Sequence, residues 1–240
     1  KAANKPTDAP LILGDISNKS VENLKIASSF YVVPELLSQI MGEVNYKIAF
    51  NGGVTVTPGV RYLKQIDIGA GEVVGAALTG NLVDESGAKG GYKEAGSLDS
   101  QMIAARIVAK YESYKINIAM TNILDEADLV TPWRAFPTGG YTRSMARYHW
   151  QANTKNYRLE VVKNGNKKGI YKELYTQASL LHTDRDESKG LFDENYYYVG
   201  FVQNLPQHLA LQLRFRIGYQ ESKKPDGSGL DTRFEMNYIF

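Results

Sequence analysis

Six arginines stand at positions where strict alternation would place them all on the polar faces of strands. They come from several separate segments, and two of them are only two residues apart. A guanidinium presents a rigid fork of N–H donors that suits a carboxylate, and a row of them along a wet passage would attract anions. The alternative is a solvated sheet face, where these arginines form weak ion pairs with Glu43, Glu160 and Glu235. The six are Arg61, Arg106, Arg158, Arg214, Arg216 and Arg233.

A long segment without a clear strand pattern, residues 122–153, concentrates aromatic and basic side chains. Three aromatics and two arginines fall within eleven residues, which argues against a disordered loop. Loops of this length are usually functional if they are ordered. The segment could fold inward and narrow a passage, or it could pack its aromatic residues on itself outside. The side chains concerned are Trp133, Arg134, Phe136, Tyr141 and Arg143.

Two acidic clusters offer carboxylate oxygens, which are the ligands that Ca²⁺ prefers. One spans residues 125–128, and neither has the spacing of a calcium loop, so we expect solvated loop tips. The three histidines show no metal-ligand spacing, and no motif sets a nucleophile beside a base. The sequence therefore predicts no cofactor and no enzyme. The second cluster comprises Asp184, Asp186, Glu187, Asp193 and Glu194.

Composition narrows the class of protein. The 240 residues are compatible with a single domain, and a formal net charge of +2 makes no case for nucleic-acid binding. The lack of cysteine excludes a disulfide scaffold and thiolate metal sites. No apolar run approaches the roughly 18 residues of a membrane helix. A membrane barrel remains open, because its strands turn only every second residue to lipid.

The clearest strand pattern lies in residues 208–240, where two alternating runs flank a polar tip. The polar face of the first run holds Gln212, Arg214 and Arg216, which suits a wet interior. The chain ends on Phe240 with Tyr238 two residues earlier, as an outer-membrane strand does at the periplasmic interface. We interpret the stretch as the closing hairpin of a transmembrane antiparallel β-barrel. Its predicted lipid face begins with Leu209, Leu211, Leu213, Phe215 and Ile217.

Alternation along the rest of the chain predicts ten strands in one barrel domain that covers residues 1–240. Residues 1–20 show no clear period and are interpreted as a lead-in segment that begins in the periplasm. Short connections alternate with long ones, as they do in barrels with short periplasmic turns and long outer loops. The predicted outer loops are 69–99, 122–153, 185–192 and 222–230. Tyrosines toward strand ends fit an aromatic girdle. They are Tyr46, Tyr62, Tyr111, Tyr114, Tyr219 and Tyr238.

Within the long segment, residues 131–148 read TPWRAFPTGGYTRSMARY and are followed by Ala152-Asn153-Thr154-Lys155. This stretch resembles the OprD-type family of outer-membrane porins, in particular the branch from Helicobacter and Campylobacter relatives. GVRYLKQID at 59–67, DENYY at 193–197 and RFEMNY at 233–238 fit the same family. The resemblance runs from about Val21 to Phe240, and outside residues 131–147 it is generic barrel sequence.

The resemblance implies a Gram-negative outer-membrane barrel of about 18 strands, monomeric or weakly trimeric, in contact with the bilayer and lipopolysaccharide. Members pass small solutes, often amino acids or carboxylates, along a ladder of arginines. Ten predicted strands are too few, so either the first eight are absent from this sequence or the protein is a smaller relative. The match to the C-terminal part of the family favours the first alternative. In that case the first and tenth strands do not pair with each other.

The competing hypothesis is a soluble or surface-exposed all-β binding protein, either a sandwich or a lipocalin-like barrel. The two differ in which face is apolar, since a lipocalin buries apolar residues inside and shows polar ones outside. For the membrane barrel we expect a preference for anionic or carboxylate-bearing solutes, because six arginines meet only three glutamates on the polar face. A cation preference would instead point to the acidic loops at 125–128 and 184–187.

Overall fold

A computed structural model describes residues 10–69, 98–129, 140–145, 150–165, 168, 172–205, 211–224 and 226–238 of the chain. This part is all-β, and its one helical turn is the 3-10 helix η1 (Glu187–Lys189). It contains no helix that is long and apolar enough to cross a membrane. The strands are β1 (Ile12–Asn18), β2 (Leu24–Val33), β3 (Leu37–Tyr46), β4 (Ile48–Ala49), β5 (Thr55–Asp67), β6 (Ser100–Tyr111), β7 (Tyr114–Ile123), β8 (Thr154–Lys163), β9 (Tyr175–Asp184), β10 (Glu194–Asn204), β11 (Leu211–Ser222) and β12 (Gly229–Tyr238).

All twelve strands belong to one antiparallel sheet, and all but β4 follow one another across it in chain order. The short β4 lies beside β5. Since neighbours in this sheet are antiparallel, successive connections lie at alternate ends. The four long predicted loops fall at the same end, in the connections 68–99, 124–153, 185–193 and 223–228. The ten predicted strands are all present, which confirms an all-β antiparallel architecture.

The prediction of a lead-in segment over residues 1–20 is wrong for its second half, because β1 pairs with β2 along its whole length. The alternation of β1 is hidden in the sequence, since Ile12 and Leu13 are neighbours that point to opposite faces. Gly14 lies opposite Phe30 and leaves room for its ring, which a Cβ at that position would overlap. The chain therefore enters the sheet one strand earlier than the pattern predicts. Residues 1–9 lie outside the described part.

The alternating pattern of β3 extends to Phe50 in the sequence, but the strand is interrupted at Lys47 and continues as β4. Both β3 and β4 pair with β5 in one register, Asn45 with Gly59 and Ile48 with Val56. This register places Pro58 beside the interruption. Proline has no N–H to donate, so the ladder is broken there without a change of register.

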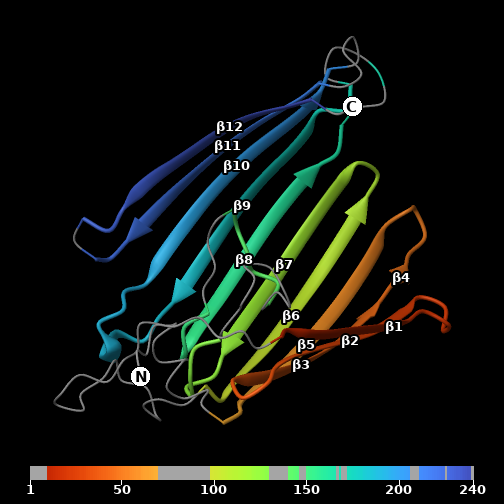
Figure 1. The fold of residues 1–240 in the computed structure, drawn as a ribbon. Coiled ribbons are helices and arrows are strands. Elements are labelled where there is room, and N and C mark those ends of the chain that lie inside the picture. Colours follow the sequence, from red (N-terminus) through yellow and green to blue (C-terminus); the bar gives the residue numbers. More distant parts are fainter. Residues whose placement is uncertain are drawn as a thin grey trace.

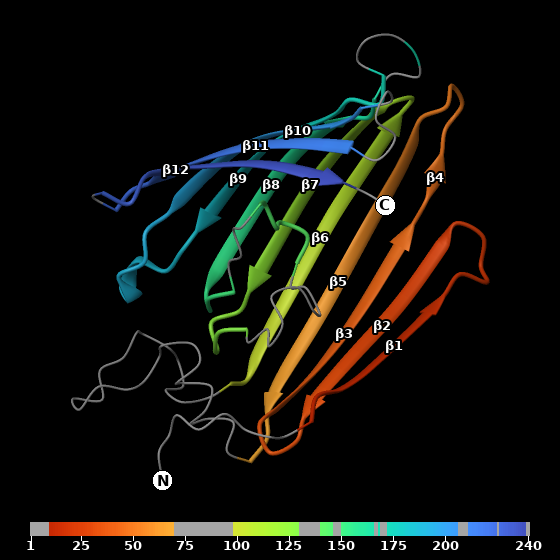
Figure 2. The same ribbon diagram turned by 45° about the horizontal axis from the view of Figure 1, so that its top comes forward.

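Figures 1 and 2 show that the sheet is strongly curved, with one concave and one convex face. Large apolar side chains cover the convex face. Ile107, Ile118 and Leu159 lie on neighbouring strands there and are between 46% and 56% exposed. The six tyrosines that were expected to form a girdle are exposed as well. On the concave face, by contrast, Ala119 is buried and polar residues dominate the centre.

The apolar core of the described residues lies where connections fold back onto the concave face. One buried cluster joins β3, β5, β6 and β7 to the connection between β7 and β8. It consists of Met41, Leu63, Met102, Ala104, Ala119, Ile123, Leu129 and Tyr141, with Trp150 packed against it. The inner side of the sheet is therefore partly covered by the chain itself.

The sheet is open in the part of the chain that the structure describes. Strands β1 and β12 stand at the two ends of its order, and no pairing joins them. This agrees with the expectation that the first and last strands do not close a small barrel together. The curvature and the strand order are those of part of a barrel wall (Figure 1).

Candidate functional site

The structure places all six predicted arginines on the concave face. Cross-strand partners share a face, so the register carries this face from one strand to the next. Ala119 of β7 faces both Arg106 of β6 and Arg158 of β8. On the last two strands, Arg216 lies opposite Arg233, and Arg214 lies opposite a glutamate. Arg233 pairs with Asp231 of its own strand at 3.0 Å.

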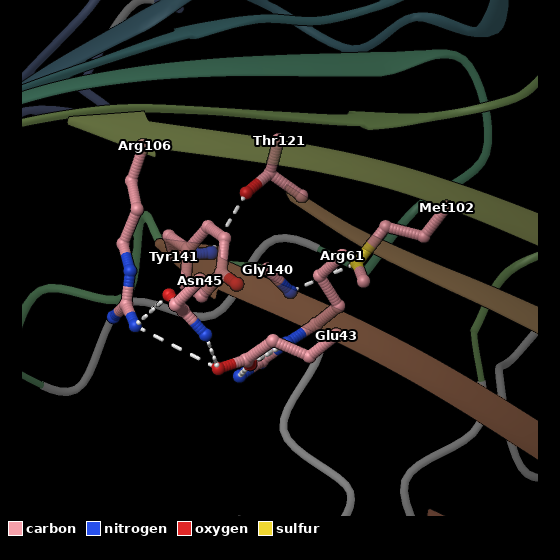
Figure 3. A network of polar contacts seen from close by, with 8 residues as sticks. All are labelled: Glu43, Asn45, Arg61, Met102, Arg106, Thr121, Gly140 and Tyr141. Atoms are coloured by element: carbon pink, nitrogen blue, oxygen red, sulfur yellow. Dashed lines mark hydrogen bonds and ion pairs between the residues drawn. The ribbon is translucent and has the colours of Figure 1, made fainter. Parts of the chain in front are cut away.

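The first charged unit consists of Glu43, Arg61 and Arg106, from β3, β5 and β6 (Figure 3). Arg61 donates through Nε to Glu43 Oε2 at 2.8 Å and also forms an ion pair with it. Arg106 lies 3.7 Å from Glu43 Oε1 and donates to Asn45 Oδ1 at 2.8 Å. Asn45 in turn donates to Glu43 Oε1 at 2.6 Å. Gly59 makes this reach across β5 possible, because a Cβ there would overlap Asn45.

Tyr141, from the connection between β7 and β8, covers the first unit. Its ring centre lies 4.5 Å from the Arg61 guanidinium carbon and 4.2 Å from that of Arg106, so both cations contact its π face. Figure 3 shows the ring between the two arginines. Burial raises the pKa of Tyr141 to about 12, and the two guanidiniums oppose part of this shift. The phenol is therefore neutral when its contacts with the arginines form.

The segment that carries Tyr141 is tied to the wall by its backbone. The Tyr141 N–H donates to Thr121 Oγ1 at 3.1 Å, and the Thr142 hydroxyl donates to the same oxygen at 3.0 Å. Gly140 N–H lies 2.8 Å from the sulfur of Met102. A Cβ at Gly140 would overlap the Thr121 side chain, so this close approach requires glycine. The segment therefore lies flat against β6 and β7.

Further along, the same segment reaches β9 and β10. The Ser144 hydroxyl lies 3.3 Å from that of Ser179, and Met145 packs against Leu181 with two tyrosines of β10. The described residues 140–145 thus form a strap across the concave face, which Figure 1 shows inside the curve of the sheet. Of the predicted loop side chains, Tyr141 is buried in this strap and Arg143 is exposed. Trp133, Arg134 and Phe136 lie outside the described residues.

The second charged unit consists of Lys115, Arg158 and Glu160, from β7 and β8. Arg158 forms an ion pair with Glu160 Oε2, and Lys115 Nζ lies 3.1 Å from Oε1. Gln177 donates to Glu160 Oε2 at 2.5 Å from the next strand. The carboxylate is thus surrounded by donors on three sides. Of these partners, only Arg158 had been predicted at the site.

The third charged unit consists of Arg214, Arg216 and Glu235, from β11 and β12. Arg214 donates to Glu235 Oε2 at 3.2 Å, and Arg216 forms an ion pair with Oε1. The side chains of Arg214 and Glu235 are 37% and 34% exposed, so this unit is open on its inner side. Near it, Gly218 leaves room for the hydroxyl end of Tyr196, which lies along the wall.

The three units share one composition, which is two cations and one carboxylate. Each therefore carries a formal charge of +1, although every arginine in them has an acidic partner. The sequence left open whether the arginines form ion pairs or make the face basic. In these units both hold for the same side chains. A polar face built this way carries an excess of positive charge and still pairs most of its buried charged groups.

The acidic clusters have protein partners rather than a shared centre. Asp186 caps η1 by accepting from Ser188 N–H at 3.0 Å, and it also accepts from Asn153. Asp184 lies 3.9 Å from Lys155, and Glu187 lies 3.8 Å from Lys223. No group of three or more acidic or histidine side chains that could hold a metal ion occurs in the described residues.

The predicted acidic group at 125–128 supports the fold of the long connection. Asp128 accepts from the N–H of Ala152 at 2.8 Å, and Glu126 accepts from Gln101 at 2.7 Å. Of the histidines, His182 lies on the convex face, where its ring stacks on Tyr157 and its Nδ1 is 2.9 Å from Asn195 Oδ1. His149 and His208 lie outside the described residues.

Sequence reasoning missed the polar residues that organise the units. Asn45 and Gln177 are ordinary strand amides, and nothing in their spacing marks them. Lys115 was not singled out, because its partner lies on the next strand. Thr121 anchors the strap, but a threonine in an alternating strand gives no signal of that role. Glu160, two residues after Arg158 on one strand, could have been paired with it from the sequence.

A meander of antiparallel strands with an apolar convex face and a charged concave face defines the membrane β-barrel class. Solved structures of outer-membrane porins share this fold. OccK8 (OprE) of Pseudomonas aeruginosa matches with a TM-score of 0.78 at 11% identity, over 99% of this chain and 59% of that chain. OpdL of the same organism matches with a TM-score of 0.70 at 14% identity, over 95% of this chain and 58% of that chain.

OpdK of Pseudomonas aeruginosa, in a structure with vanillate, matches with a TM-score of 0.70 at 13% identity. That match covers 95% of this chain and 55% of OpdK. The chain thus spans between one half and two thirds of the length of these solved structures. No protein-family model matches the sequence, and no curated protein matches it. The likeness shows the fold, which is part of the wall of a transmembrane β-barrel.

Proposed function

We propose that this chain is part of a bacterial outer-membrane porin of the OprD type. Small hydrophilic solutes diffuse passively through its lumen, and anionic or carboxylate-bearing solutes are favoured over cations of equal size. The observation that supports this best is the concave face, where three separate units each hold two cations and one carboxylate. The protein acts as a channel and not as an enzyme.

The distribution of apolar side chains supports the membrane location. Exposed aliphatic and aromatic residues lie on the convex face, and charged residues line the concave face. A soluble lipocalin-like barrel would require the reverse arrangement. We therefore assign the convex face to the bilayer, with lipopolysaccharide at the outer leaflet. The long connections then face outward and the short turns face the periplasm.

The open edges of the sheet support a larger complete barrel. Bare strand edges are not tolerated in the hydrocarbon core, so β1 and β12 must each pair with a further strand in the membrane. The solved porins that match are longer than this chain, which leaves room for such strands. We propose that the chain is the C-terminal part of an OprD-type barrel from the Helicobacter and Campylobacter branch. It works as a monomer or a trimer.

Charge selectivity follows from the units because low-dielectric walls concentrate their field in the lumen. Each unit contributes one excess positive charge at a different position around the wall. The strap narrows the space beside the first unit, so solutes pass close to charged side chains there. We expect Arg61, Arg106, Arg158, Arg214 and Arg216 to contribute to selectivity, and Arg233 to contribute less because Asp231 neutralises it.

The reversal potential of the complete protein in a planar bilayer under a salt gradient tests this proposal. We expect the sign of an anion-selective channel. Replacing Arg106, Arg158 and Arg214 together by Gln is expected to move the potential toward cations. Lys155→Gln is the matched control, since Lys155 is a cation on the convex face. A wild-type channel that prefers cations would show that the concave units do not set the selectivity.

A further inference from the structure

The carboxylate of each charged unit bridges two different cations, one at each oxygen. In the first unit, Glu43 Oε2 faces Arg61 and Oε1 faces Arg106. In the second unit, Oε2 of Glu160 faces Arg158 and Oε1 faces Lys115. The third unit repeats this arrangement, with Arg214 at Oε2 and Arg216 at Oε1 of its glutamate.

This arrangement is a carboxylate-binding site that is already occupied. Two cations spaced to hold the two oxygens of one carboxylate would bind a free carboxylate in the same way. In this chain the occupant is covalently attached, because Glu43, Glu160 and Glu235 belong to the wall. The three glutamates come from three different strands, so the pattern is not the result of one local sequence motif.

We propose that these glutamates are tethered competitors of the solute. A permeating carboxylate displaces the glutamate from one of its two cations, binds there, and leaves when the glutamate returns. The solute class is small carboxylates, and the inference rests on the proposed function as an anion-favouring channel. The glutamates therefore determine how long a solute stays, whereas the cations determine which charge enters.

The physical reason for such a competitor is that transport requires weak binding. A site must attract the solute enough to admit it and must release it quickly enough to conduct. Two cations without a carboxylate would hold an anionic solute too long. The tethered glutamate lowers the affinity and also spares the wall two uncompensated charges while no solute is present.

Amide side chains stabilise the glutamate when it yields one cation. Gln177 donates to Glu160 Oε2, which is the oxygen that Arg158 also contacts. In the first unit, Asn45 donates to Glu43 Oε1, the oxygen that faces Arg106. In both units, the oxygen with the amide donor thus keeps a hydrogen bond when its cation, Arg158 or Arg106, binds a solute.

The test compares Glu160→Gln and Glu235→Gln with Glu194→Gln in the complete protein. Gln keeps the shape but cannot neutralise two cations. Glu194 is the matched control, because it is a concave-face carboxylate with Arg185 as its cation at 2.9 Å, outside the three units. The measurement is the acetate concentration at which single-channel conductance is half saturated. In Glu160→Gln and Glu235→Gln we expect this half-saturating concentration to fall roughly tenfold, because a charge-assisted competitor is lost. In the control we expect no change.

A half-saturating concentration that stays at the wild-type value in both unit variants would overturn the inference. So would an equal fall in Glu194→Gln, because any inner carboxylate would then suffice. If the buried Glu160 variant fails to fold, the more exposed Glu235 variant carries the test alone. The wild-type reversal potential separates the two proposals. An anion-selective wild type with unchanged variants rejects only the competitor, whereas a cation-selective wild type rejects the proposed function.

Discussion

The first and third charged units have the same composition but very different surroundings. In the first, the side chains of Glu43 and Arg61 are only 7% and 12% exposed, because Tyr141 and its strap cover them. In the third, Glu235 and Arg214 are each more than a third exposed at the side-chain level. The difference shows that the strands supply the charges, whereas the connection between β7 and β8 removes the first unit from water.

The consequence is a division of roles along one wall. Buried ion pairs are costly to break, because the remaining charge has no solvent to stabilise it. Exposed pairs contribute little to stability and exchange partners easily. We therefore expect the first unit to hold the strap as well as attract solutes. We expect the third unit to be the more accessible place for a solute to bind.

The comparison predicts unequal costs for the same substitution. Glu43→Gln removes the carboxylate that Arg61 and Arg106 share under the strap, and we expect a loss of roughly 3–5 kcal/mol in the free energy of unfolding. Glu235→Gln in the open unit is expected to cost under about 1 kcal/mol. Urea unfolding of the complete protein in lipid vesicles measures both. Equal costs would show that the strap does not isolate the first unit from water.

The second prediction concerns the orientation of the third unit, in which the side chains of Arg214 and Glu235 are more than a third exposed. Leu213 and Arg214 are neighbours on β11 and must point to opposite faces. If the convex side meets lipid, Leu213→Arg should destabilise the barrel by about 2–4 kcal/mol at mid-membrane depth. Arg214→Leu serves as the partner variant and should change conductance more than stability. Spin labels at 213 and 215 that both report water would contradict this orientation.

The third prediction concerns Tyr141, which covers the first unit. Tyr141→Leu removes a ring that contacts two guanidiniums. The interaction that holds the strap to the wall should therefore weaken by about 1–2 kcal/mol. Tyr141→Phe keeps the ring and is the control. We expect larger single-channel conductance in the Leu variant and a wild-type value in the Phe variant. The ion pairs of the third unit should be unaffected, because among the described residues Tyr141 contacts the arginines of the first unit and not those of the third. If the Phe and Leu variants behave alike, the ring is not what holds the strap.

Most of the fold could be predicted because strand alternation is a local property of the sequence. The faces of β11 and β12 follow directly from residues such as Phe215 and Phe234. Strand β1 was missed because both of its faces begin with an apolar side chain, Ile12 on one and Leu13 on the other. The period-two signal disappears when the two faces are alike.

The candidate site was predictable only as a set of arginines on one face. Its pairings depend on register, which brings Glu43 to Arg61 across eighteen residues of sequence. Neither the inward path of the strap nor the position of Tyr141 has a local signal, because both depend on contacts with β6, β7 and β9. The sequence therefore predicted which residues carry charge, and the structure shows how those charges are shared.

The smallest expected effect lies outside the charged units, at the end of the sheet that carries the long connections. There Asp193 accepts from Lys223 Nζ at 2.6 Å and from the Arg185 N–H at 3.0 Å. The hydrogen bond from Lys223 has the largest effect. Together with the bond from the Arg185 N–H, it holds the pKa of Asp193 below its usual range. A lowered pKa means that the folded state favours the charged carboxylate. Its contribution is therefore complete above the ordinary aspartate pKa of about 3.9 and disappears as the pH falls through the lower folded value.

Asp193→Asn should accordingly lower thermal stability slightly at pH 6 and not at all near pH 2, where the wild-type carboxyl is protonated as well. Glu221→Gln, on the convex face of the same end, is the comparison variant, because its carboxylate accepts from Tyr197 rather than from a lysine. High salt should shrink the Asp193 effect, since Lys223 is exposed and its attraction is screened. The covered first unit should keep its stability in the same salt. A stability difference for Asp193→Asn that persists at pH 2 would mean that its hydrogen bonds, and not its charge, connect the two loops.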